Sequence, residues 1–219
     1  MFAGHIGAAL ALGRAERRVN PGVFVLAALL LDLVLWIFVL LGWESVAIPA
    51  NFAGTHQPVF VFPYSHGLLA AIAWSLLAGT ATVALYRHLK AERLRAAVFV
   101  GLAVFSHWLL DALVHAPEMP IAGESSRKLG LGLWNSMPAA LFVEALITLA
   151  GLWLFVATAN LARGKRATLV VVTLVALAFT VTGMTVAPAP PSVAAMADSS
   201  LVTIVVVSAL VGWLGKRAP

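Results

Sequence analysis

Apolar segments of about 20 residues recur along this chain, and each is long enough to cross a bilayer as a helix. A helix of about 20 residues spans about 30 Å, the thickness of a membrane core. The chain is 62% hydrophobic and only 11% charged, whereas about a quarter of a soluble domain is charged. The segments also lack the alternation typical of membrane β-barrels. We therefore expect an all-α polytopic membrane bundle, with six spans at 21–42, 64–86, 96–115, 138–162, 167–187 and 200–215.

Basic residues mark one side of this expected bundle. Twelve of the fourteen lysines and arginines lie before the first span, between spans two and three, between spans four and five, or after the sixth. Basic loops stay on the cytoplasmic side of a membrane, so we expect these loops and both termini there. The loops 43–63, 116–137 and 188–199 then face outward. We interpret the basic residues as a sign of topology and expect no nucleic-acid partner.

The first apolar segment is too short to be a span. Residues 2–13 are apolar and are followed by Arg14, so we expect a short helix that enters the membrane part-way or lies along it. No internal repeat or second domain is apparent. We interpret 1–219 as one membrane domain, in which 1–162 carries the titratable residues and 163–219 forms a two-span scaffold hairpin.

A polar stripe interrupts the third apolar segment. His107, Asp111 and His115 are spaced four residues apart, which places them on one face of a helix. Ionisable residues inside a membrane are energetically costly and indicate a functional site. The alternative is structural, with Asp111 pairing with the two histidines to hold helices together.

Further titratable residues are expected at a similar depth. The helical rise of about 1.5 Å per residue places Asp32 near the membrane midplane and His66 and Glu144 in the outer half. His5 reaches the same layer if the short first helix dips inward. These residues are therefore expected to converge on one polar pocket.

The residue types in this pocket suit a divalent metal. The chain has no cysteine, so the ligands would be nitrogen and oxygen atoms, which favour zinc, with manganese or iron as alternatives. Asp32 and Glu144 are the expected catalytic carboxylates, acting as a general base or orienting a ligand histidine. The expected metal ligands are His5, His66, His107, Asp111 and His115.

Several of these residues lie in segments that resemble a known family. Gly4-His5-Ile6-Gly7, Asp32, Tyr64-Ser65-His66 and Ser106-His107 with Asp111 look like the pattern of bacterial inner-membrane metal-dependent hydrolases, which are distantly similar to zinc-dependent phospholipase C. A narrower subgroup shares the segments Pro63 to His66, Ser106 to Pro117 and Gly130 to Asn135. The resemblance covers roughly residues 1–160.

The resemblance implies hydrolysis of a lipid-like or phosphoester substrate at a metal site in a bacterial inner membrane. Two departures concern the chemistry. The family has Pro-Asp-x-Asp where this chain has Leu31-Asp32-Leu33-Val34, and a His-Arg pair before the later histidine where this chain has Phe60 and Val61. A second acid and an arginine suited to phosphate are therefore missing.

Two other classes of function fit the same sequence. An ion- or proton-coupled transporter would use the acids and histidines as a relay. A non-enzymatic subunit of a membrane complex would retain the polar pocket as a vestige, and a haem protein would use two facing histidines as iron ligands. Membrane lipid is the expected surrounding and possible substrate, and the sequence predicts no oligomeric state.

Overall fold

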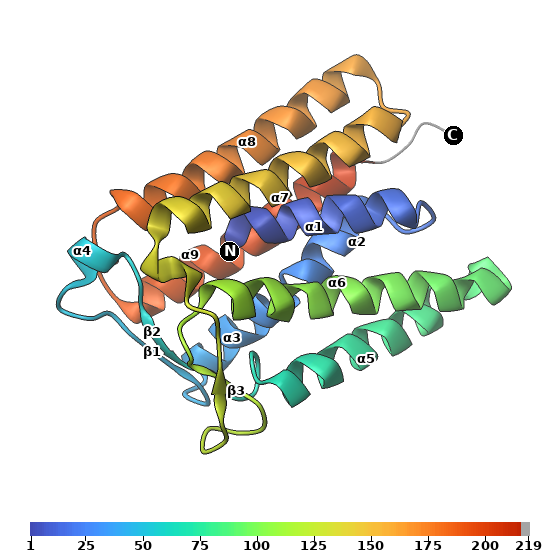
Figure 1. The fold of residues 1–219 in the computed structure, drawn as a ribbon. Helices are drawn as coiled ribbons and strands as arrows, with labels where there is room; N and C mark the ends of the chain where they lie inside the picture. Colours follow the sequence, from blue (N-terminus) through green and yellow to red (C-terminus); the bar gives the residue numbers. More distant parts are fainter. Residues whose placement is uncertain (216–219) are drawn as a thin grey trace.

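Long helices that run alongside one another make up most of the chain in the computed structural model, which describes residues 1–215 (Figure 1). Five of them are long and apolar enough to cross a membrane, which confirms the predicted all-α membrane bundle. They are α5 (Leu68–Leu85), α6 (Arg93–Val114), α7 (Met137–Thr158), α8 (Arg163–Thr185) and α9 (Val193–Leu214).

The first predicted span is broken in two. Residues 21–42 were expected to form one helix, but α2 (Pro21–Ala28) and α3 (Leu30–Leu40) meet at a bend of 50°. Leu29 at the bend has φ −107° and ψ 9°, outside the helical range. The last carbonyls of a helix have no partner within it. The carbonyl of Ala28, the last residue of α2, is bonded instead by His107 of α6. Taken as one bent span, the pair brings the number of possible spans in the described chain to six.

The short N-terminal helix α1 (Phe2–Ala15) lies inside the bundle, between α6 and α7 (Figure 1). Its length is about 21 Å, so it covers only part of a membrane thickness. Eight of its residues are buried, including His5, Gly7 and Leu10. Of the two placements that the sequence left open, the helix therefore takes the one that enters the bundle part-way.

The C-terminal end of α1 is fixed by a buried carboxylate. Glu16 is fully buried, and its oxygens accept hydrogen bonds from Arg18 Nη1 at 3.2 Å. Arg95 at the start of α6 pairs with Glu16 at 3.0 Å and donates to the Ala15 carbonyl at 2.9 Å. The hydrogen bond with Glu16 raises the pKa of Arg18. This network ties α1 to α6 at the end of the bundle where the basic residues gather.

The opposite end of the bundle carries the longer loops. One antiparallel pair, β1 (Ser45–Ala47) with β2 (Val59–Val61), flanks the short helix α4 (Phe52–Thr55). A second pair follows α6, and a 3-10 turn connects it to α7; the elements are β3 (Met119–Pro120), β4 (Lys128–Leu129) and η2 (Leu133–Asn135). The 3-10 segment η1 (Arg87–Glu92) lies at the basic end, between α5 and α6.

The last helix is longer than predicted. The sixth span was expected at 200–215, with Asp198 in the preceding loop, but α9 begins at Val193 and includes Asp198. The Ser192 side chain accepts a hydrogen bond from the backbone N–H of Ala195 at 3.0 Å. Such an N-cap satisfies a free donor of the first turn, which accounts for the earlier start.

Candidate metal centre

All three residues of the polar stripe are buried, but only the first two belong to α6. His107 and Asp111 are buried, and His107 Nε2 lies 3.0 Å from Asp111 Oδ2. His115 is no longer helical, with φ −63° and ψ 144°. Pro117 restricts the residue before it to extended conformations, so the helix ends at Val114. The stripe thus continues into the loop with a different direction.

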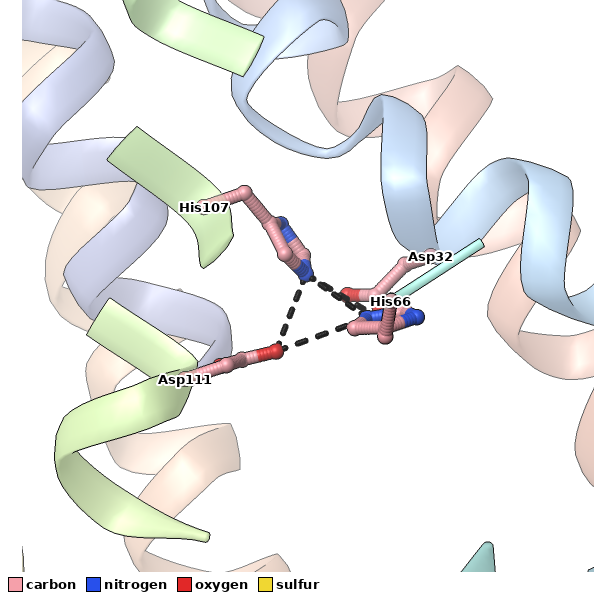
Figure 2. Close-up of side chains that lie close together, drawn as sticks. All are labelled: Asp32, His66, His107 and Asp111. Carbon is pink, nitrogen blue, oxygen red and sulfur yellow. Dashed lines mark hydrogen bonds and ion pairs between the residues drawn. The ribbon is translucent and has the colours of Figure 1, made fainter. Parts of the chain in front are cut away.

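Asp32 from α3 and His66 from the segment before α5 join these two residues (Figure 2). His66 Nε2 lies 3.1 Å from His107 Nε2 and 3.5 Å from Asp111 Oδ2. Asp32 Oδ1 lies 3.6 Å from the Nε2 atoms of both histidines. All four groups offer an atom within 4.8 Å of the others. We call this set the His-Asp cluster; its members are Asp32, His66, His107 and Asp111.

The orientation of His107 is set by the bend of the first span. Its Nδ1 lies 2.6 Å from the carbonyl oxygen of Ala28, the last residue of α2. A carbonyl only accepts hydrogen bonds, so Nδ1 carries the proton and donates it. In the neutral ring, Nε2 is then an unprotonated acceptor that faces the cluster.

His66 is oriented by a chain of two hydrogen bonds. Ser65 Oγ donates to Glu44 Oε2 at 2.7 Å and lies 2.8 Å from His66 Nδ1. Because the single hydroxyl proton goes to the carboxylate, His66 Nδ1 is the donor to Ser65. Glu44 is held in turn by the backbone N–H groups of Tyr64 and Ser65, both at 2.8 Å. The Nε2 of a neutral His66 therefore also faces the cluster without a proton.

With both histidine rings neutral, the cluster therefore consists of acceptors without a donor between them. Two imidazole nitrogens and two carboxylates meet at distances of 3.0 to 3.6 Å. In a tetrahedral zinc site, ligand atoms about 2.0–2.1 Å from the metal are about 3.3–3.4 Å from one another. The observed distances bracket this value. The residues present fit a small divalent cation in both donor type and spacing.

His5 lies next to the cluster without belonging to it. Its ring stacks on that of His107 at 3.9 Å, and its Nε2 lies 3.1 Å from Asp111 Oδ1. The amino group of Met1 contacts the same oxygen at 3.3 Å. His5 Nδ1 is buried and has no hydrogen-bond partner among residues 1–215. His5 thus contacts Asp111 through Oδ1, while His66 and His107 contact Oδ2.

His115 and Glu144 are not members of the His-Asp cluster. His115 Nε2 is 3.9 Å from Asp111 Oδ2, while its Nδ1 is 2.5 Å from Glu118 Oε1. Glu144 Oε1 accepts a hydrogen bond from the backbone N–H of Gly4 at 3.1 Å. Both residues line the same cavity as the cluster. The structure thus brings all seven sequence-predicted residues to one region, while their individual roles stay predictions.

This cavity has a volume of about 360 Å³, within the usual range of ligand pockets of about 300–1,000 Å³. Asp32, His66 and Asp111 form its polar floor. Its remaining wall is largely apolar and comes from α3, α8, α9 and the loops at the end of the bundle opposite the basic residues. Asp32 is the most exposed member of the cluster, with 26% of its side chain accessible, against 4% or less for the others. It is therefore the member best placed to meet a molecule in the cavity.

Three partners in the site were not predicted from the sequence. They are the carbonyl of Ala28, the carboxylate of Glu44 and the carboxylate of Glu118. Glu118 follows His115 by three residues, a spacing that gives some indication of contact. Glu44 gives no such signal, because it lies more than twenty residues before His66, in the loop between α3 and β1.

Comparisons with protein-family models, curated proteins and solved structures found no match to this chain. The geometry of the site is therefore what indicates a function.

Replacing Ser65 by alanine tests whether the Glu44–Ser65–His66 chain orients a ligand. Loss of such a partner typically weakens metal binding by about 10–100-fold, and we expect a change in this range for Ser65→Ala and Glu44→Gln. Zinc affinity would be measured by competition with a chromogenic chelator. Ser106→Ala is the matched control, since Ser106 Oγ bonds only its own helix, at Ala103 O. Equal affinities of all three variants and the wild type would refute this positioning role.

Proposed function

We propose that this protein is a membrane-embedded metal-dependent hydrolase with a lipid-like or phosphoester substrate. The observation that supports this most strongly is the His-Asp cluster, in which two histidines, each bonded through Nδ1, and two carboxylates converge. When both rings are neutral, no donor lies between these groups. Buried acceptors without a donor are costly, and a divalent cation removes this cost. The two carboxylates would balance its charge.

We propose zinc as the metal, because nitrogen and oxygen ligands at tetrahedral spacing suit it. His66, His107 and Asp111 would hold it, since catalytic zinc sites have about three protein ligands and one open position. When bound, the metal supplies a Lewis acid that activates water and polarises the substrate. Asp32, longer in its contacts and open to the cavity, would accept a proton from water as the general base.

The other cavity residues would assist this chemistry. The carboxylate of Glu118 holds His115 through Nδ1 and leaves His115 Nε2, 3.9 Å from Asp111 Oδ2, as the ring nitrogen nearer the cluster. Glu144 reaches the cavity from α7, and one of its oxygens is engaged by Gly4. We propose that the protein resides in a bacterial inner membrane, with its basic loops and both termini in the cytoplasm. The cavity would then be reached from the outer side.

Metal content and one variant test this proposal. We expect about one zinc per chain in detergent-purified protein, measured by mass spectrometry of the metal. Asp32→Asn should retain zinc but lose zinc-dependent ester hydrolysis by about 100-fold or more, as expected when a general base is removed. If the wild type binds no zinc, manganese or iron after incubation and dialysis, the metal centre is wrong, and a proton relay becomes the better explanation of the cluster.

A further inference from the structure

We infer that the cavity accepts an uncharged amphiphile, with a hydrocarbon chain against the apolar wall and an ester or amide carbonyl at the His-Asp cluster. The inference rests on the proposed function and narrows it, since it selects carboxylic esters and amides over anionic phosphate esters.

The wall of the cavity suits a hydrocarbon chain. Away from its floor the lining includes the apolar side chains of Leu35, Trp36, Phe179, Met184, Met196 and Ile204. Methionine side chains adapt to irregular apolar shapes, and a charged group placed here would lose its hydration without a partner. A chain can therefore occupy the part of the cavity formed by α3, α8 and α9.

The charge of the cavity argues against a phosphate group. Three carboxylates line it, those of Asp32, Asp111 and Glu144, and no lysine or arginine side chain among residues 1–215 does so. Among side chains, arginine and lysine are the usual ligands of phosphate. One divalent cation would offset two of the carboxylates, and the Met1 amino group is already paired with Asp111 at 3.3 Å. Apart from the histidines His56, His66 and His115, an anionic ester would thus meet no cationic side chain among residues 1–215 in this cavity.

The reaction on such a substrate needs only water. The water oxygen forms a bond to the carbonyl carbon, and the bond from that carbon to the alcohol oxygen or amine nitrogen breaks. One water proton goes to the leaving group by way of the cavity residues, and the products are a carboxylic acid and an alcohol or amine. Asp32, on the cavity floor, would accept the proton from water before it reaches the leaving group.

Gly183 provides a way to narrow the cavity without disturbing the bundle. It lies on α8 and lines the cavity, and a Cβ atom added there would meet no atom within 4 Å. Gly183→Leu should therefore fold normally while occupying space needed by a hydrocarbon chain. Gly164, on the same helix but away from the cavity, is equally open, so Gly164→Leu is the matched control.

The test is a binding titration that does not depend on turnover. Trp36 and Trp134 line the cavity, so a bromine on a bound chain would quench their fluorescence. The probes are N-methyl-8-bromooctanamide and 8-bromooctyl phosphate, added to zinc-loaded protein in detergent. Like-charge contacts oppose binding, so we expect the phosphate to bind at least about tenfold more weakly than the amide. Gly183→Leu should weaken amide binding about tenfold, and Gly164→Leu should leave it unchanged.

Three results would overturn the inference: phosphate binding as tight as amide binding, no saturable amide binding, or amide binding that Gly183→Leu leaves intact. The outcome is separate from that of the metal measurement. If the protein binds no zinc but still binds the amide in a Gly183-dependent way, the hydrolase proposal is wrong and the inference about the cavity ligand stands. If the protein binds zinc but prefers the phosphate, the inference about the cavity ligand is wrong and the hydrolase proposal stands.

Discussion

Replacing His107 by alanine is expected to abolish zinc binding, with an affinity loss of more than about 100-fold. Loss of a residue that merely orients a ligand costs about 10–100-fold, and His107 is itself a proposed ligand. Its Nε2 is 3.0 Å from Asp111 and 3.1 Å from His66, the shortest contacts in the cluster. The variant also leaves the Ala28 carbonyl without its donor. Zinc per chain and chelator competition would measure the effect.

A second variant and a control separate metal loss from unfolding. Asp111→Asn keeps the shape of the side chain but removes its charge, so it should lose zinc with less damage to packing. His88 lies exposed in η1 at the basic end of the bundle, and His88→Ala should bind zinc as the wild type does. Thermal unfolding in detergent would check each variant. If His107→Ala and Asp111→Asn both fold and retain one zinc per chain, the metal binds elsewhere.

Helical periodicity identified the core of this site because α6 is a regular helix. His107 and Asp111 are one turn apart, and their side chains meet as the spacing predicts. His115 was expected within the helix and is instead its C-cap, yet its Nε2 still lies 3.9 Å from Asp111 Oδ2. The Ala116-Pro117 pair is visible in the sequence, and it could have limited the helical part of the stripe to two residues.

Contacts between distant segments could not be predicted in this way. Glu44 reaches Ser65 through the pairing of β1 with β2, and the sequence does not specify this register. The bend at Leu29 lies in an uninterrupted apolar run without proline or glycine. The Ala28 carbonyl at this bend is bonded by the His107 ring, which belongs to a helix almost 80 residues later. Both features depend on tertiary packing, which overrides local sequence preference.

The cavity shows a different limit of sequence reasoning. The last two spans carry almost no titratable residue, so the sequence indicated only a scaffold role for 163–219. In the structure α8 and α9 line the cavity with apolar side chains such as Phe179, Met196 and Ile204. A search for charged residues cannot detect such a contribution. The scaffold role of 163–219 stays a prediction. The ligand titration with Gly183→Leu tests whether α8 also contributes to ligand binding.

Gly151→Ala is expected to destabilise the bundle strongly, although it adds a single methyl group. The backbones of α1 and α7 cross closely, so a Cβ on Gly151 would overlap the Gly7 carbonyl and lie 2.8 Å from Gly7 Cα. A Cβ on Gly7 would likewise lie 2.6 Å from Thr148 Cα. Backbone atoms cannot rotate away as a side chain does, so the helices must separate. Such overpacking costs about 1–3 kcal/mol or more.

At about 3 kcal/mol this cost corresponds to a fall in Tm of about 6–12 °C for a chain of this size, measurable by thermal unfolding in detergent. Gly183→Ala is the matched control, because its Cβ meets open space and alanine is favoured over glycine within a helix by about 1 kcal/mol. It should leave the Tm unchanged or raise it. Because α1 also carries His5, which stacks on His107, separation of α1 from α7 should weaken zinc binding as well. An unchanged Tm for Gly151→Ala would mean that α1 is not packed against α7 as closely as the structure places it.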